Sequence, residues 1–305
     1  MRVLVAGREG QVARALLARL GAAGHLVTAL EPPALDLADR ASVAAVVAAA
    51  APDLVVNAAA YTAVDRAEDQ PELARAVNAT GAGWLAEAAA ARGAPFVHFS
   101  TDYVFDGRKG APYVEADPVA PLGVYGATKA EGERLVLAAN PRAVVLRTAW
   151  VCSADGANFV KTMLRLGAER DEIRVVADQH GAPTFAADLA DAVARMAPRL
   201  AAAAAGDAAF GLFHLSGMPH TSWHGFAEAI LDGAARRGRP RPRLVAITTA
   251  DYPTRAARPA DGRMDCGRIA QVHGVAAADW RAGLEATLDL LVGPAGAPLT
   301  GEMGA

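Results

Sequence analysis

Short, continuous apolar runs alternate with longer amphipathic stretches along the first half of the chain. The apolar runs have the length of strands and lie at 3–6, 26–30, 54–57, 96–100, 144–147 and 174–176. Helices are predicted between them, at 11–21, 41–50, 70–92 and 125–139. Runs in which Val, Leu and Ile follow one another without polar alternation are typical of strands buried on both faces of a sheet. The pattern therefore predicts an α/β fold built on a doubly wound parallel sheet.

The pattern changes near residue 150, where glycines and prolines begin to interrupt the chain. They cluster at 178–185, 216–223 and 236–244, and helices are predicted at 155–169, 186–199, 222–237 and 279–291. We expect residues 1–150 to form one domain and residues 151–292 mainly a smaller C-terminal lobe. Elements near 170–200 are expected to return to the first domain, so that the two are partly interleaved. Residues 293–305 are rich in Gly, Pro and Ala, which predicts a flexible tail.

Composition and charge exclude several classes of protein. Hydrophobic residues make up 53% of the 305 positions and charged residues 21%, which is enough apolar material for a packed core. The net charge of −3 offers no basic field for nucleic acid. No apolar stretch approaches the roughly 18–20 residues that cross a bilayer, the N-terminus begins directly with a predicted strand, and the two cysteines have no metal-ligand spacing. We therefore expect a cytoplasmic protein without a membrane or nucleic-acid partner.

The first predicted strand ends in a glycine turn that opens a helix. Gly7 and Gly10 permit a tight turn in which backbone N–H groups at the helix start face an anion, and Ala13 allows close packing of helix and strand. This arrangement is typical of Rossmann-type dinucleotide-binding domains, although the spacing is GxxGxxA rather than GxGxxG. Two glycines after a strand are also common in turns that bind no ligand.

Acidic residues follow the second predicted strand, about 20 residues further along, where such folds hold an adenosine ribose. Glu31 is placed to accept hydrogen bonds from that ribose, which favours NADH, and Asp36 and Leu37 could reach the adenine. Arg8 in the glycine turn could instead meet the 2′-phosphate of NADPH. The ordinary alternatives are a solvated arginine and a strand-end acid, so the sequence leaves NADPH or NADH open.

Tyr125 and Lys129 lie four residues apart in a predicted helix and therefore on one face, with Cβ atoms about 5–6 Å apart. A phenol with a pKa of about 10 is a poor acid at neutral pH. A neighbouring ammonium group stabilises the phenolate, so we expect Lys129 to lower the pKa of Tyr125. Such a pair can deliver a proton to an oxygen whose carbon receives a hydride, and the lysine can hold the ribose of a nicotinamide. A bare pair with this spacing is more often a surface feature.

Two further strand ends supply groups for the same crevice. Segment 96–107, FVHFSTDYVFDG, is a predicted buried strand that ends at Ser100, Thr101 and Asp102. Segment 55–68, VVNAAAYTAVDRAE, ends in small alanines against which a cofactor could lie. Ligands of a doubly wound sheet collect at the carboxyl ends of its strands. We therefore expect Thr101 to place a hydroxyl beside the tyrosine, where it can bind the substrate oxygen.

The order of these motifs resembles that of the extended short-chain dehydrogenases/reductases. GxxGxxA, NAAA, STDYVFDG and YGATK follow one another at 7–13, 57–60, 100–107 and 125–129. The longer segments NAAAYTAVDRAE, RTAWV, NFVKTML, DQHGAPT and TSWHGFA are similar to those of the dTDP-4-dehydrorhamnose reductases within this superfamily. The resemblance extends from Arg2 to about Leu291.

This resemblance implies an oxidoreductase of dTDP-rhamnose biosynthesis, which transfers hydride from NAD(P)H to the C4 carbonyl of a dTDP-linked 4-keto sugar. It implies a catalytic set of Thr101, Tyr125 as proton donor, and Lys129. The cofactor would be bound by Gly7, Gly10, Gln11, Val12, Glu31, Asp36, Leu37, Ala58, Ala59, Tyr61, Tyr125 and Lys129. The sugar nucleotide would be bound by Thr62, Val64, Thr101, Asp102 and Trp150. Each residue also has an ordinary structural alternative, such as core packing for Trp150 or turn capping for Asp102.

One departure from the family concerns metal. Some members are dimers bridged by magnesium through glutamates, and the positions that align with those glutamates are Ala15, Ala187 and Arg281. Alanine offers no oxygen ligand, and the arginine would repel a divalent cation. We therefore expect no metal, and a monomer or a weak homodimer.

Two alternatives remain open at this point. A non-catalytic regulatory subunit, similar to the one that accompanies methionine adenosyltransferase, would keep the nucleotide cleft and act by binding, and fold alone does not exclude it. The second alternative is another enzyme of the superfamily, such as an epimerase, a dehydratase or a reductase of a different 4-keto sugar. The intact set of Thr101, Tyr125 and Lys129 favours catalysis. Tyr103 follows Asp102 where a dehydratase is expected to carry a second acid, which speaks against a dehydratase.

Overall fold

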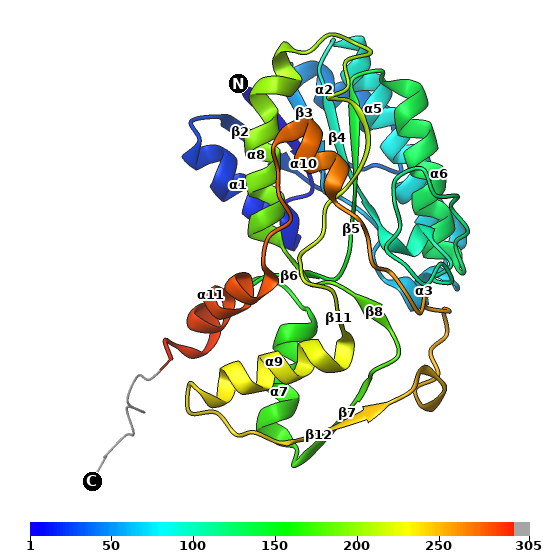
Figure 1. Cartoon of the computed structure of the whole chain (residues 1–305). Helices are drawn as coiled ribbons and strands as arrows, with labels where there is room; N and C mark the ends of the chain where they lie inside the picture. Colours follow the sequence, from blue (N-terminus) through cyan, green and yellow to red (C-terminus); the bar gives the residue numbers. More distant parts are fainter. Residues whose placement is uncertain (296–305) are drawn as a thin grey trace.

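The computed structural model describes residues 1–295, and its centre is a six-stranded parallel sheet (Figure 1). The strand order is β10-β5-β4-β3-β1-β2, and every neighbouring pair runs parallel. The strands are β1 Arg2–Ala6, β2 Leu26–Leu30, β3 Leu54–Asn57, β4 Phe96–Thr101, β5 Ala143–Thr148 and β10 Gly211–His214. The chain moves outward from β1 to β2 and then crosses to β3 on the other side of β1. The strand order therefore reverses direction between β1 and β3, which confirms the predicted doubly wound fold.

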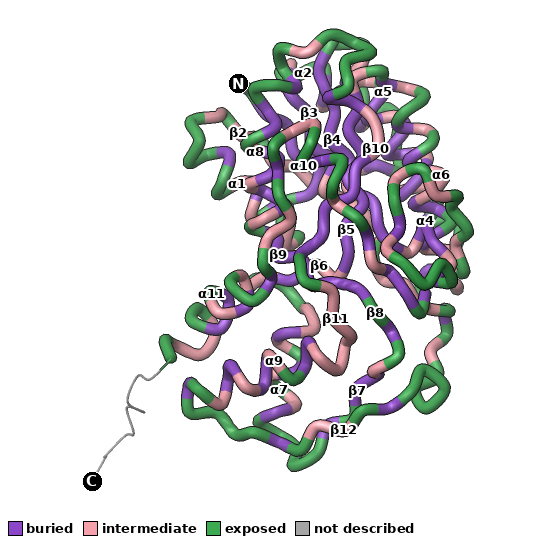
Figure 2. The backbone as a smooth tube through the Cα atoms, in the orientation of Figure 1, coloured by how far each residue is buried: buried purple, intermediate pink, exposed green. Residues whose placement is uncertain are grey.

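Alternate residues of each central strand enter two different cores, because successive side chains of a strand point to opposite faces. Val3 and Val5 pack with α1 (Gln11–Ala22) and α8 (Ala186–Ala202), whereas Leu4 and Ala6 pack with α2 (Arg40–Ala50) and α5 (Ala82–Ala91). Helix α6 (Val124–Ala139) joins α2 and α5 on one face of the sheet, and α10 (Gly267–His273) joins α1 and α8 on the other. Figure 2 shows the strands as the buried centre of this part of the molecule. Burial on both faces explains why the strands lack polar alternation.

A smaller lobe lies at the carboxyl edge of the sheet (Figure 1). Its core is formed mainly by α7 (Phe159–Glu169), α9 (Trp223–Ala235) and α11 (Trp280–Val292), with side chains such as Phe226 and Trp280 at its centre. The parallel pair of β7 (Glu172–Val176) and β12 (Arg243–Ile247) borders it. The short strands β6 (Val151–Cys152), β8 (His180–Gly181), β9 (Thr184–Phe185) and β11 (Thr221–Ser222) join the lobe to the sheet.

The structure differs from the sequence-based prediction at three elements. The predicted strand at 174–176 exists as part of β7 but pairs with β12, and the sixth strand of the main sheet is β10 instead. The predicted helix at 70–92 is divided into α4 (Pro71–Arg75), a π-helical turn η1 (Ala76–Gly81) and α5. The helix predicted at 155–169 begins only at Phe159, because the side chain of Asn158 caps it by accepting a hydrogen bond from the backbone of Lys161. Most of the predicted tail, residues 296–305, lies outside the described residues.

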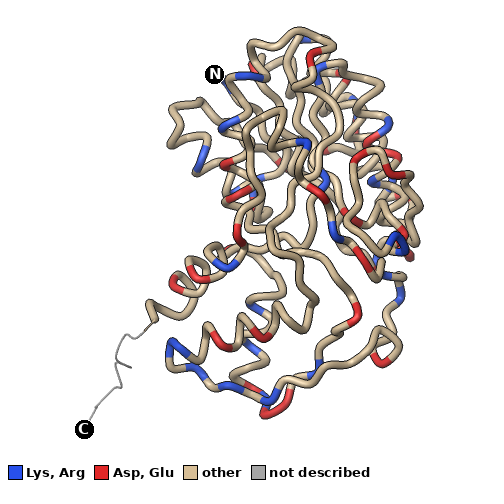
Figure 3. The backbone as a smooth tube through the Cα atoms, viewed as in Figure 1, with Lys and Arg blue, Asp and Glu red and all other residues tan. Residues whose placement is uncertain are grey.

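Further short elements, α3 (Val64–Ala67), η2 (Asp102–Val104) and η3 (Thr249–Asp251), lie in the loops. None of the helices in residues 1–295 combines the length and apolar character that a membrane span requires. Acidic and basic residues are interspersed along the chain (Figure 3).

Helix α6 is fixed against the sheet by a buried ion pair. Arg147 of β5 donates two hydrogen bonds to the carboxylate of Glu133 of α6, at 2.8 and 2.6 Å, and Ser100 of β4 donates a third at 2.6 Å. The two charged side chains are only 3% and 7% exposed. Two glycines allow the same helix to approach neighbouring segments closely. A Cβ on Gly126 would overlap the carbonyl oxygen of Tyr103, and a Cβ on Gly132 would overlap that of Asn78.

We predict that Glu133→Ala lowers the free energy of unfolding by about 3–5 kcal/mol, because it leaves the Arg147 guanidinium buried without a counter-charge. Urea unfolding followed by circular dichroism measures the change. Glu131→Ala is the matched control on the same helix, since Glu131 pairs with Arg75 at the surface and exposed pairs contribute less than about 1 kcal/mol. Equal losses in the two variants would contradict the assigned role of the buried pair.

Candidate active site

A cavity of about 760 Å³ lies at the carboxyl ends of the central strands, where the strand order reverses. Doubly wound folds bind their ligands at this place. The residues predicted from the sequence that line the cavity are Gly7, Gly10, Gln11, Val12, Glu31, Asp36, Leu37, Ala58, Ala59, Thr62, Val64, Thr101, Asp102, Tyr125, Lys129 and Trp150. The structure thus brings residues from positions 7 to 150 onto one continuous surface.

Tyr61 is the predicted site residue that does not line this cavity. Its hydroxyl donates a hydrogen bond to Gln70 at the surface, at 2.8 Å. Its backbone is held by Asn78 of η1, whose side chain accepts from Tyr61 N–H at 2.8 Å and donates to the Tyr61 carbonyl at 3.1 Å. In this conformation the Tyr61 side chain is engaged with Gln70, and its place in the cofactor channel stays a prediction.

The glycine turn lies close to the next strand end and has a backbone conformation that favours glycine. Gly7 has φ +100°, and a Cβ there would lie 3.3 Å from the backbone of Ala58 and Ala59. Helix α1 follows directly, and Gly10 precedes it without a side-chain cap. The first N–H groups of a helix have no partners within the helix, so they can bind an anion in the cavity. The Gln11 side chain accepts hydrogen bonds from Ser153 (3.0 Å) and Asn158 (2.9 Å), which ties the turn to the smaller lobe.

Glu31 lies at the end of the cavity next to the glycine turn. Its carboxylate accepts hydrogen bonds from the backbone N–H groups of Arg8 and Glu9, at 3.2 and 3.1 Å. The carboxylate is thereby held in one place, where it can accept hydrogen bonds from ribose hydroxyls. The Arg8 side chain lies 3.7 Å from Glu9 and is 63% exposed, so it is free to move toward a phosphate.

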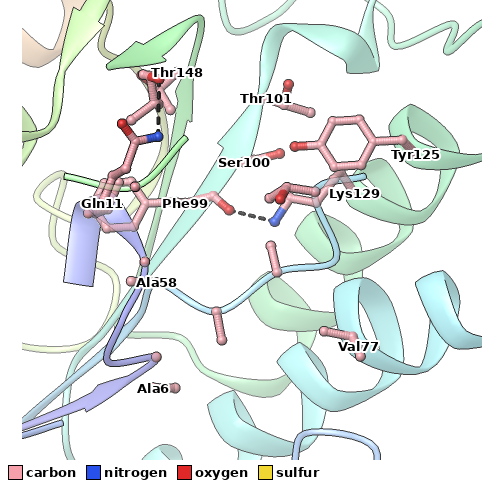
Figure 4. A pocket seen from close by; sticks show the side chains of 18 of the residues that line it. Ala6, Gln11, Ala58, Val77, Phe99, Ser100, Thr101, Tyr125, Lys129 and Thr148 are labelled. Atoms are coloured by element: carbon pink, nitrogen blue, oxygen red, sulfur yellow. Dashed lines mark hydrogen bonds between the residues drawn. The ribbon is translucent and has the colours of Figure 1, made fainter. Parts of the chain in front are cut away.

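The predicted catalytic residues meet on the opposite wall of the cavity. Thr101 ends β4, and Tyr125 and Lys129 lie one helical turn apart near the start of α6. Figure 4 shows the Tyr125 hydroxyl directed toward Ser100 and Thr101, and the Lys129 amine directed toward the Phe99 carbonyl. Lys129 donates to that carbonyl at 2.6 Å and is 2% exposed.

Burial dominates the proton affinities of this pair. Removal of the Tyr125 phenol from water raises its pKa to about 12, the adjacent Thr101 hydroxyl opposes this rise, and Asp102 adds to it. Burial also lowers the pKa of Lys129 to about 8, against the opposing charge of Glu133. The expectation that Lys129 lowers the pKa of Tyr125 is thus wrong for the free protein. The Lys129 amine is turned to the Phe99 carbonyl and to His98, at 3.2 Å, instead of to the phenol.

Asp102 is a buried carboxyl group beside Thr101. It is 2% exposed and accepts a hydrogen bond from the Thr101 hydroxyl at 3.0 Å. Burial raises the pKa of Asp102 to about 7, although hydrogen bonds from Thr101 and the backbone oppose the shift. Near neutral pH this carboxyl group can therefore be present as acid or as carboxylate.

Two stacked indoles form the wall of the cavity toward the smaller lobe. The rings of Trp150 and Trp223 lie 3.7 Å apart with an angle of 14° between their planes, and both residues line the cavity. Trp150 has φ +47°, a left-handed conformation that is unusual for a bulky side chain. Phe159 packs at 4.7 Å on the other side of Trp223. A strained backbone at the cavity wall indicates that the position of this indole matters for the site.

Sequence reasoning missed several lining residues, among them Trp223, Phe99 and Thr148. Trp223 lies within TSWHGFA, one of the segments that resemble the reductase family, and this resemblance could have indicated it as a site residue. The hydroxyl of Thr148 is buried without a hydrogen-bond partner, and Thr148 lies beside Thr101 in the register of β4 and β5. A buried hydroxyl that has no protein partner is available to a ligand.

Within residues 1–295, no three His, Cys, Asp or Glu side chains lie close enough together to hold a metal ion. The arginine at position 281 packs its guanidinium over the ring of Trp280, at 4.7 Å.

Comparison with known proteins gives concordant matches. The family model described as RmlD substrate binding domain matches residues 1–292. The dTDP-4-dehydrorhamnose reductase of Sinorhizobium fredii is 46% identical over 280 residues, which cover 92% of this chain and 94% of that protein. The crystal structure of a dTDP-4-dehydrorhamnose reductase from Clostridium acetobutylicum superposes with a TM-score of 0.89 at 36% identity, covering 95% of this chain and 99% of that one. That of Bacillus anthracis, in complex with NADP, gives 0.87 at 34% identity, covering 94% and 98%.

We predict that Asp102 makes the stability of the protein depend on pH. The acid is favoured in the folded state, so the stability that it contributes is lost as the pH rises from about 4 to about 7, by up to about 4 kcal/mol. Asp102→Asn keeps the shape and the hydrogen bond to Thr101 but cannot ionise. The difference in unfolding free energy between Asp102→Asn and the wild type should therefore grow over this pH range. Parallel stability curves for the two proteins would contradict the raised pKa.

Proposed function

Because the chain belongs to the family of dTDP-4-dehydrorhamnose reductases, we propose that it reduces the C4 ketone of dTDP-4-dehydro-6-deoxy-L-mannose to dTDP-L-rhamnose with NAD(P)H. The observation that carries the proposal is the convergence of Thr101, Tyr125 and Lys129 on one wall of a cavity whose other end is a glycine turn. A binding-only protein needs the glycine turn but has no use for a buried phenol and amine beside a strand-end hydroxyl.

The cavity suits a dinucleotide at its glycine end. Gly7 leaves room for a pyrophosphate, and the N–H groups at Gly10, Gln11 and Val12 can bind it. The adenosine would lie along Glu31, Asp36 and Leu37, and the nicotinamide half along Ala58 and Ala59 toward Lys129. When bound, the reduced nicotinamide supplies the hydride.

Tyr125 is suited to the role of proton donor. Because burial raises its pKa to about 12, the phenol carries its proton at neutral pH. As the substrate C4 accepts a hydride, negative charge develops on its oxygen, and this oxygen takes the proton from Tyr125. The Thr101 hydroxyl, whose single proton faces Asp102 in this structure, can turn to donate a second hydrogen bond to the same oxygen, and positive charge on Lys129 stabilises the phenolate that remains.

The substrate would occupy the part of the cavity between the catalytic wall and the smaller lobe. Asp102 and Trp150 are placed to contact the sugar nucleotide, with Thr62 and Val64 beside it. Trp223 adds a second indole face at the same wall. We further propose that the protein acts in the cytoplasm, as a monomer or weak homodimer without a metal.

We predict that Tyr125→Phe lowers kcat by at least about 10²-fold, the lower end of what general acid catalysis contributes. The affinity for NADPH, measured by fluorescence titration, should stay within about threefold, because the variant retains the glycine turn, Glu31 and Lys129, which would still hold the dinucleotide. Turnover of the 4-keto sugar nucleotide near the wild-type rate would remove Tyr125 as the proton donor. If Tyr125→Phe lost both NADPH binding and turnover, Tyr125 would instead be required for the structure of the cavity.

We predict that NADH and NADPH both support turnover, with kcat/KM values within about 100-fold, or 2.7 kcal/mol, of each other. Glu31 should disfavour the 2′-phosphate and Arg8 should favour it. Glu31→Gln should therefore shift the ratio of kcat/KM toward NADPH by about tenfold, and Arg8→Gln should shift it toward NADH. A ratio that is unchanged in both variants would show that neither side chain faces the adenosine ribose.

A further inference from the structure

Lys129 has a buried neighbour on the side away from the cavity. Its Nζ lies 3.2 Å from Nε2 of His98, and Nδ1 of the same ring lies 3.1 Å from Nδ2 of Asn57. His98 is fully buried, and Asn57 and Lys129 are 1% and 2% exposed. The ring of Phe96 stacks against His98 at 6.4 Å. His98 has no part in the chemistry described above, yet it is in direct contact with the catalytic amine.

The hydrogen-bond roles in this chain of side chains determine one another. The side-chain oxygen of Asn57 accepts a hydrogen bond from Ala59 N–H at 3.2 Å, so its NH₂ group faces His98. An amide NH₂ can only donate, so Nδ1 of His98 accepts and a neutral ring carries its proton on Nε2. That proton points at Lys129. An ammonium group has no lone pair with which to accept it, whereas an amine has one.

The ammonium form of Lys129 requires the opposite arrangement. Nε2 must then accept, so the ring proton lies on Nδ1 and needs an acceptor on Asn57. The Asn57 amide must rotate to present its oxygen, which breaks the hydrogen bond from Ala59 N–H. Each charge state of Lys129 thus keeps a hydrogen bond to His98, and the two states differ by a ring tautomer and an amide rotation. In the ammonium state the Ala59 N–H loses its side-chain acceptor, and Ala59 lines the cavity.

The charges around the pair keep the ring neutral while the lysine titrates. Burial, and next the charge of Lys129, hold the pKa of His98 well below its ordinary value. The pKa of Lys129 lies at about 8 through burial, and Glu133, one turn further along α6, is the opposing charge. The neighbours of His98 on β3 and β4, Asn57 and Phe96, carry no charge.

We propose that His98 is a positioning residue that lets Lys129 pass between ammonium and amine while its contact with Nε2 remains a hydrogen bond in both states. In this step the lysine loses one positive charge, the ring moves its proton from Nδ1 to Nε2, and the pair as a whole releases one proton. An unpaired buried donor or acceptor costs about 1–3 kcal/mol, and the tautomer change avoids this cost at the Lys129–His98 contact. The role of this coupled proton shift in catalysis rests on the proposed function, in which Tyr125 must regain a proton after each turnover. The tautomer change itself needs no substrate.

Nitrogen NMR of the full-length protein labelled with ¹⁵N-histidine tests the proposal directly, because the two neutral tautomers have distinct ring shifts. The chain has seven histidines, and His98→Gln identifies the signals of this one. The ring of His98 should stay neutral and change from the Nδ1–H to the Nε2–H tautomer as the pH rises, with a midpoint near the pKa of Lys129, about 8. Lys129→Met should abolish the change. Phe96→Leu, which disturbs the packing of the ring and removes no polar partner, should retain it.

A single tautomer throughout the titration would overturn the proposal. So would protonation of the ring to imidazolium with an ordinary midpoint near about 6.5, or a tautomer change that persists in Lys129→Met.

The pH profile of kcat/KM gives an independent readout. Removing the ring acceptor destabilises the ammonium group, so His98→Phe should move the profile limb that depends on Lys129 to lower pH by about one unit. His98→Gln, whose amide can donate or accept, should restore it. An unshifted limb in His98→Phe would contradict the role. A tautomer change in a protein that does not turn over the 4-keto sugar nucleotide would contradict the proposed function and leave the coupled protonation standing.

Discussion

The position of helix α6 against the ends of β4 and β5 is the constraint on which the site depends. The helix carries both the phenol and the amine, whereas the hydroxyl that must meet them lies at the end of β4. Glycines at 126 and 132 permit backbone contact, and the bidentate pair of Glu133 and Arg147 sets the depth at which the helix lies. A buried charge without a partner is costly, so this pair disfavours any displacement of the helix. Catalytic geometry here is a consequence of core packing.

The same packing explains the unusual proton affinities. Lys129 and Asp102 lie in water-poor surroundings and have a lowered and a raised pKa, respectively, so both groups can change charge near neutral pH. Perturbed groups of this kind cluster at functional sites, because a general acid or base works best when its pKa lies near the operating pH. The phenol of Tyr125 is kept protonated by its surroundings, which suits a donor. In the proposed reaction, Lys129 stabilises the phenolate after the proton has left.

Local pattern predicts much of this structure and fails where the outcome depends on distant contacts. The central strands and the Tyr125–Lys129 helix follow from continuous apolar runs and from helical spacing. The sequence does not predict that the apolar run in β7 leaves the main sheet, because the competing strand β10 is a short segment after an alanine-rich stretch. The three strand ends could be placed together because parallel sheets align them. The stack of Trp150 on Trp223 joins residues 73 positions apart, and the link from Lys129 to His98 and Asn57 crosses two strands and a helix, so local pattern carries no signal for either.

The central claim is that a phenol proton and a nicotinamide hydrogen arrive at the two ends of one bound C=O. Incubation of the protein with dTDP-4-keto-6-deoxy-L-mannose and NADPH deuterated at C4 of the nicotinamide tests it most directly. Loss of nicotinamide absorbance, with deuterium appearing at C4 of the dTDP-L-rhamnose product, is the predicted result. Unchanged absorbance in the presence of that ketone, or a product without deuterium at C4, would contradict the account.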